Sequence, residues 1–142
     1  MNNDLPATTR DEVNAIEAQM QTMPQVGMTV VDHFSPDVYA RELHIPAGTV
    51  LTGRIHKFAN MNMLLKGEIS VAVDGKIVRM VAPQTIVSPP GTKRIAYTHT
   101  DCIWTTIHGT AEVDVDVIRD HFTAGSEQEY LAYCAHLAIE GK

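Results

Sequence analysis

The sequence contains few of the residues, and none of the long runs, that mark several common protein classes. It has two cysteines among 142 residues, Cys102 and Cys134, and they form no CxxC pair, so we expect two reduced thiols rather than a disulfide, redox or zinc motif. No apolar stretch approaches the roughly 20 residues needed to cross a bilayer, and residues 1–10 lack a signal-peptide pattern. We therefore expect a cytoplasmic protein with no membrane partner.

Familiar catalytic signatures are absent as well. The chain has no Walker loop, no GxGxxG, no GxSxG and no HExxH. A cysteine–histidine dyad is also excluded, because Cys102 and His108 would lie roughly 20 Å apart along one predicted strand. The sequence therefore predicts no catalytic residue.

Charge is distributed unevenly along the chain. The formal net charge of −6 argues against wholesale nucleic-acid binding. Between residues 54 and 94, however, seven basic residues stand against two acidic ones. A basic centre between acidic flanks favours a small anion in one pocket and disfavours long polyanions. The residues counted are Arg54, Lys57, Lys66, Lys76, Arg79, Lys93 and Arg94 against Glu68 and Asp74.

Two amphipathic helices are predicted, one near each end of the chain. The first covers residues 9–23 and is ended by Pro24, and the second covers residues 127–139 and is followed by Gly141. Each begins with a capping-box spacing, Thr9 with Glu12 and Ser126 with Glu129. These helices divide the chain into a helical segment at 1–24, a central domain at 25–118 and a terminal helix at 119–142.

The central domain is predicted to consist of short strands. Segments rich in Val, Ile, Leu, Thr and Tyr alternate with turns, which indicates an antiparallel sandwich or barrel. Asp74 and Gly75 predict a two-residue type I′ hairpin. Glu112 to Ile118 alternates valines with acids, which predicts a half-buried strand with an acidic outer face. The expected strands are 27–32, 38–45, 50–56, 62–65, 68–73, 76–81, a short strand between Pro83 and the turn at 88–91, 94–98, 102–109 and 112–118.

One stretch carries a recognisable spacing. Gly48 is followed by Arg54 and His56, then by Asn60 and finally by Gly67. This spacing resembles the first motif of the cupin superfamily, which has a glycine, two histidines one residue apart, a glutamate and a closing glycine. Downstream, Pro89, Pro90 and Gly91 resemble the proline-any-glycine turn of the second motif, and Arg94 stands where that motif has its last histidine. The resemblance implies a mainly β, antiparallel jelly-roll barrel.

The resemblance also implies a metal site whose ligands have largely been replaced. The four ligand positions hold Arg54, His56, Asn60 and Arg94, and a protonated guanidinium repels a cation. We therefore predict no cofactor and no metal. The alternative is a divalent Fe, Mn, Ni or Zn ion held by His56 with His44, His99 or His108 moved into the vacated positions.

The same positions favour an anion-binding pocket. In the cupin register Arg54, His56, Asn60, Asn62 and Arg94 point inward, and paired arginines suit a phosphate or carboxylate. Tyr97 or Trp104 would add a flat surface for a base or ring. Trp104 shares a strand face with His108, and parity leaves open whether that face is interior. Alternatively, the two arginines face outward or pair with Glu42 and Asp101.

The leading hypothesis is a non-catalytic barrel that binds an anionic small molecule, such as a nucleotide. The run from Val87 to His108 also resembles small uncharacterised cupin-like proteins of bacteriophages, which implies a role in the host cytoplasm, such as sequestering a nucleotide signal. The alternatives are a metal-dependent dioxygenase, isomerase or lyase and a structural or assembly protein. Cupin relatives are frequently homodimers, so we also expect a homo-oligomer.

Overall fold

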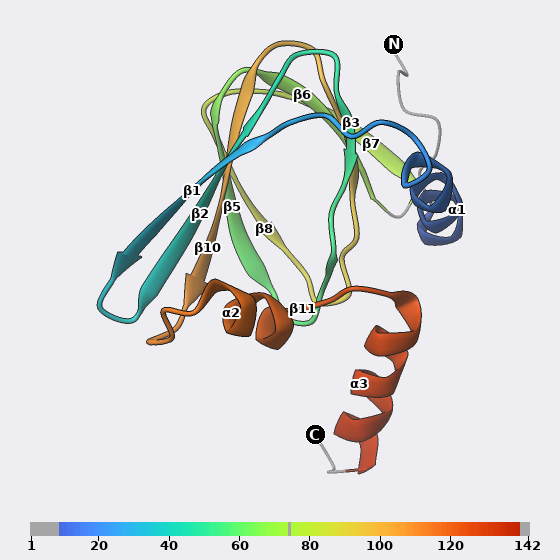
Figure 1. Ribbon diagram of the computed structural model, residues 1–142, viewed down its shortest axis with the longest axis vertical. Coiled ribbons are helices and arrows are strands. Elements are labelled where there is room, and N and C mark those ends of the chain that lie inside the picture. The colour runs from blue at the N-terminus through green and yellow to red at the C-terminus, as the bar shows by residue number, and fades with distance from the viewer. Residues whose placement is uncertain (1–8, 74, 140–142) are drawn as a thin grey trace.

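A computed structural model describes residues 9–73 and 75–139, which form a mainly β structure with three helices. The elements are α1 Arg10–Met20, β1 Thr29–Ser35, β2 Val38–Ile45, β3 Val50–Thr52, β4 Ile55–His56, β5 Asn60–Lys66, β6 Glu68–Val73, β7 Lys76–Val81, β8 Gln84–Ser88, β9 Ile95–Thr98, β10 Cys102–Gly109, α2 Val115–Phe122, β11 Thr123–Ala124 and α3 Glu127–Ile139. Two antiparallel sheets face each other, α1 lies beside them, and α2 and α3 lie at one end of the barrel (Figure 1).

The larger sheet has the strand order β1-β2-β10-β5-β8, and the smaller one has the order β3-β9-β6-β7. The short strands β4 and β11 pair with each other. Every pairing is antiparallel, and β10 connects the hairpin of β1 and β2 to β5. The predicted jelly-roll architecture is confirmed.

The main hydrophobic core lies between the two sheets. Its buried members come from both of them, and the half-buried Leu43, Leu51 and Trp104 pack against it. Cys102 belongs to this core and is a free thiol, as is Cys134. Burial raises the pKa of the Cys102 thiol, which keeps it protonated and unreactive. The buried members are Ile45, Leu64, Ile69, Val71, Met80, Ala96 and Cys102.

Helix α1 packs on the outer side of the smaller sheet. The predicted capping box of Thr9 and Glu12 is present and satisfies the first backbone N–H groups of the helix. Val13 is fully buried and forms a second cluster with Ala72 and Ile95. One turn later Glu17 accepts a 2.7 Å hydrogen bond from Lys93, which is 5% exposed. The helix is therefore held by an apolar contact and a largely buried ion pair.

The predicted strand over residues 112–118 is wrong. Asp114 is the N-cap of α2, and its carboxylate accepts hydrogen bonds from the backbone N–H groups of Asp116 at 2.9 Å and Val117 at 3.3 Å. The alternating valines do not bury one face, because Val113 and Val117 are exposed and Ile118 is the buried residue. The expected domain boundary at residue 118 thus falls within a helix.

Helix α3 covers the predicted range Glu127–Ile139 and points away from the barrel (Figure 1). The backbone N–H of Glu129 donates to Ser126 Oγ at 3.1 Å, as the capping spacing indicated. None of its side chains is buried, and the Arg10 guanidinium carbon lies 5.2 Å from the Tyr130 ring centre. Gly141, the expected helix stop, lies outside the described residues.

Two predicted glycine turns differ in how far they are described. Gly67, the closing glycine of the first motif, has a φ of 91°, and a Cβ there would lie 2.3 Å from the carbonyl oxygen of Asp101. In the hairpin of β6 and β7, Val73 pairs with Lys76 and Gly75 has a φ of 80°, whereas Asp74 lies outside the described residues.

Within the described ranges, no helix has the length and apolar character to span a membrane.

Candidate functional site

A cavity of about 640 Å³ opens inside the barrel beneath α2. Its lining comes from both sheets and from the chain around α2. Four arginines contribute to the lining, and Asp32 is its one carboxylate among the described residues. The Asp32 carboxylate already accepts a hydrogen bond from the Tyr39 hydroxyl. The basic side chains and imidazoles are Arg41, Arg54, His56, Arg94, His108 and Arg119.

Arg94 enters the cavity from the chain just before β9. It is half-buried, its guanidinium donates to the Ser88 hydroxyl, and its central carbon lies 5.6 Å from the centre of the Trp104 ring. Burial lowers its pKa to about 10, so the group stays protonated at neutral pH. No carboxylate in the described part of the chain forms an ion pair with it. The alternative pairing with Asp101 is not seen, and the Asp101 carboxylate instead accepts from the backbone N–H of Ala47 at 2.8 Å.

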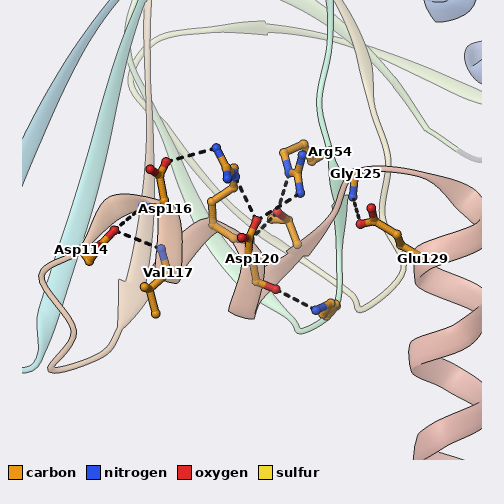
Figure 2. A network of polar contacts seen from close by, with 10 residues as sticks. Arg54, Asp114, Asp116, Val117, Asp120, Gly125 and Glu129 are labelled. Atoms are coloured by element: carbon orange, nitrogen blue, oxygen red, sulfur yellow. Dashed lines mark hydrogen bonds and ion pairs between the residues drawn. The ribbon is translucent and has the colours of Figure 1, made fainter.

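Arg54 lies at the mouth of the cavity, next to α2. Its Nε donates to Thr123 Oγ1 at 2.7 Å, and its guanidinium lies 3.9 Å from the carboxylate of Asp120 (Figure 2). Asp120 also accepts a hydrogen bond from Arg119 Nε at 3.1 Å. Both Asp120 partners are substantially exposed, and exposed ion pairs contribute only about 0–1 kcal/mol. The neighbouring side chains therefore orient the Arg54 guanidinium, but its ion pair with Asp120 is exposed to solvent and leaves its positive charge available at the cavity.

Arg41 is a basic residue of the cavity that the motif comparison missed. It lies on β2 and lines the cavity together with Tyr39, Leu43 and Ile45, which share its parity. It is exposed at the cavity mouth and forms no ion pair among the described residues. The signal was present in the sequence, because the apolar residues at every second position of β2 place residue 41 on the same face. Glu42, the alternative partner considered for the arginines, points outward and contacts His33 at 2.9 Å.

His56 and His108 share the cavity as neutral imidazoles. Burial, followed by the positive charge of Arg94, lowers the pKa of His56 to about 4. Burial and the charge of Arg41 also lower the pKa of His108. At neutral pH each ring offers one N–H donor and one acceptor nitrogen. The parity left open by the sequence is thereby decided, since Trp104 and His108 both line the interior.

Asn60 and Asn62 are buried, but they lie beside the cavity rather than in its lining. Asn62 Nδ2 donates to Asn60 Oδ1 at 2.6 Å, and Asn62 Oδ1 accepts from Trp104 Nε1 at 3.3 Å and Thr106 Oγ1 at 2.8 Å. The Nδ2 group of Asn60 has no hydrogen-bond partner among the described residues. The described contacts of Asn62 thus fix the orientation of the Trp104 ring.

Tyr97 lies on the opposite face of β9, away from the cavity. It packs against the second hydrophobic cluster, and its ring centre is 5.0 Å from that of His99. His99 bonds to Ser70 at 2.7 Å, and His44 contacts Glu42 at 2.5 Å. Neither of these histidines lines the cavity. Of the three candidates named to complete a metal site, only His108 therefore shares the cavity with His56.

These positions do not fit a catalytic metal centre of the kind found in metal-binding cupins. Such a centre requires at least three protein ligands. Among residues 9–73 and 75–139, no group of three or more His, Cys, Asp or Glu side chains is arranged to hold an ion. His56 and His108 provide two imidazoles, and the neighbouring Arg94 and Arg41 would repel a cation.

No family model matches the sequence, and no curated protein matches it either. Solved structures do match. An RmlC-like cupin from Shewanella frigidimarina has a TM-score of 0.52 at 20% identity, over 64% of this chain and 81% of its own. A cupin superfamily protein from Desulfitobacterium hafniense has a TM-score of 0.51 at 11% identity, over 78% and 94%.

A conserved protein with a double-stranded β-helix domain from Klebsiella pneumoniae has a TM-score of 0.52 at 14% identity, covering 65% of this chain and 85% of its own. Identities this low establish the fold and nothing about activity. The resemblance predicted from the glycine and histidine spacing is confirmed at that level. The chain is a protein of the cupin fold, with arginines in the cavity where metal ligands stand in the motif.

Proposed function

We propose that the barrel binds an anionic small molecule in the cavity beneath α2. The observation that carries the proposal is Arg94, a half-buried guanidinium with no carboxylate partner among the described residues. A buried charge is costly unless it is paired, and a bound anion would pair it. Arg41 and Arg54 add positive charge to the same cavity.

The neutral imidazoles support this proposal. An oxyanion bound between arginines needs further hydrogen-bond donors, and a neutral imidazole supplies one. His56 also responds to such a ligand, because a nearby negative charge favours its protonated form. Binding of an anion would then be accompanied by proton uptake at pH values between about 4 and 7. The cavity volume of about 640 Å³ is within the usual range for small-molecule sites.

Isothermal titration calorimetry with phosphate, a simple carboxylate and a nucleoside monophosphate tests the proposal. Hydrogen bonds to charged groups contribute about 1.5–3 kcal/mol, so Arg94→Met should weaken anion binding by at least tenfold. Arg79→Met is the matched control, because Arg79 on β7 pairs with Glu68 on β6 and neither residue lines the cavity. Wild-type protein that binds none of these anions, or equal loss in both variants, would contradict the proposal.

A further inference from the structure

The cavity has two chemically different ends. Residues of β2 that line it run in the order Tyr39, Arg41, Leu43 and Ile45. Their partners on β10 run in the same direction as His108, Thr106, Trp104 and Cys102. The His108 ring lies 4.5 Å from that of Phe122 in α2, so the polar end is the one beneath α2. Arg41 and Ile45 are four residues apart, which is roughly 13 Å at strand rise.

The end of the cavity away from α2, called the apolar end below, is lined by apolar side chains from both sheets. Leu43, Leu51 and Trp104 remain half-buried there, although they face the barrel interior. Val71 and Ala96 from the smaller sheet complete this wall. Apolar surface left facing a cavity gains free energy when another apolar group covers it.

The apolar end offers almost no hydrogen-bonding groups. Its one polar side-chain atom among these residues is Trp104 Nε1, which already donates to Asn62. A hydroxyl or a second charged group placed there would lose its hydration without gaining a partner. The Trp104 ring lies at the boundary between the two ends, since the Arg94 guanidinium lies over it.

We propose that the ligand is amphipathic, with an oxyanion headgroup at the arginines and an unbranched alkyl or aryl body against the apolar end. The inference rests on the proposed function, because it assumes that the headgroup is an anion. It names the class of ligand: a carboxylate or phosphate monoester that carries one apolar substituent. A ribose or a polyphosphate does not match the apolar end, because its polar groups would find no hydrogen-bond partners there.

Calorimetry on the wild-type protein with acetate, butyrate, hexanoate and octanoate measures the apolar contribution directly. Affinity should rise about fourfold per added methylene until the apolar end is filled. Hexanoate should bind at least tenfold more tightly than ω-hydroxyhexanoate, whose terminal hydroxyl would lie in the apolar end. Hexyl phosphate should likewise bind more tightly than adenosine monophosphate, which has the same headgroup on a polar body.

Each other outcome overturns a defined part of the reasoning. Equal affinity along the carboxylate series, or tighter binding of adenosine monophosphate than of hexyl phosphate, overturns this inference and leaves anion binding intact. Binding of hexanol as tight as that of hexanoate overturns the role of the arginines and with it the amphipathic anion. Absence of binding by every anion overturns the proposed function as well.

A pair of variants locates the effect in the cavity. Leu43→Asn places an amide in the apolar end and should reduce the dependence of affinity on chain length. Leu65→Asn is the matched control, because Leu65 is 49% exposed and lies outside the cavity lining. Thermal melting of both variants checks that they fold. An unchanged chain-length dependence in folded Leu43→Asn protein would overturn the assignment of the apolar body to this end.

Discussion

The buried His56 imidazole should make the free energy of unfolding fall as the pH falls. Replacing His56 by glutamine should remove much of this pH dependence. In the folded protein, burial and the charge of Arg94 lower the pKa of His56 from 6.5 to about 4. In the unfolded chain the imidazole returns to its ordinary pKa near 6.5. Between these two values the unfolded chain binds a proton that the folded protein does not bind.

The direction of the effect follows from linkage. Stability rises with pH wherever the unfolded state binds more protons, so this contribution is fully present above about pH 6.5 and is lost as the pH falls toward about 4. The complete loss, at 1.36 kcal/mol per pKa unit, is about 3 kcal/mol. Between pH 7.5 and pH 5.0 the same two pKa values give a loss of about 2 kcal/mol from His56. The lowered pKa of His108 acts in the same direction.

Urea unfolding followed by the fluorescence of Trp104 measures this loss. The free energy of unfolding of the wild type should fall by at least about 2 kcal/mol from pH 7.5 to pH 5.0, and His56→Gln should fall by about 2 kcal/mol less. Carboxylates contribute equally to both proteins and cancel in the comparison. The reasoning is refuted if the two proteins lose the same stability, or if the His56 ring titrates near 6.5 in a nuclear magnetic resonance experiment on the folded protein.

Three further variants test other parts of the structure. Glu17→Ala leaves Lys93 buried without its partner and should cost about 3–5 kcal/mol of unfolding free energy by urea denaturation, much of it restored by adding Lys93→Met. Arg94→Met removes a charged group that burial destabilises; its lowered pKa corresponds to a cost of at most about 3 kcal/mol. Thermal melting without ligand should therefore show the variant to be more stable than the wild type by about 1–2 kcal/mol. Asp114→Ala removes the N-cap of α2 and should cost about 1 kcal/mol in the same assay. The predicted homo-oligomer is measured directly by light scattering of the purified chain.

The outcomes that would contradict these predictions are equally specific. If the unfolding free energy of Glu17→Ala protein is within about 1 kcal/mol of that of the wild type, the Lys93–Glu17 pair contributes no more than an exposed ion pair, and Lys93 must reach solvent. A destabilised Arg94→Met protein would mean that its contacts with Ser88 and Trp104 outweigh the cost of burying the charge. An Asp114→Ala protein of unchanged stability would argue against the helix that replaces the predicted strand.

Local patterns were sufficient for most of the secondary structure. Helix α1 begins at the capping box of Thr9 and Glu12, and α3 begins after Ser126, whose hydroxyl accepts from the backbone N–H of Glu129, because a capping side chain satisfies backbone groups only a few residues away. The error at residues 112–118 came from the same kind of local pattern. Asp114 suits both a strand with an acidic outer face and a helix cap, and the burial of Ile118 by the barrel favours the helix.

The site was only partly predictable. The motif spacing identified Arg54, His56 and Arg94, and all three line one cavity. Arg41 was accessible from strand parity but has no counterpart in the motif. Tyr97 was named because its aromatic ring could stack on a base or ring of the ligand, yet it points away from the cavity.

The sequence by itself determined the type of fold and placed arginines at two positions where the cupin motif has histidines, because turn residues, strand periodicity and motif spacing are properties of neighbouring positions. Tertiary structure alone decided which strand faces turn inward, that α2 lies over one end of the barrel, and that the cavity is basic at that end and apolar at the other. Those features arise when β2 and β10, more than fifty residues apart in the chain, pair in one register and bring their side chains into a shared space.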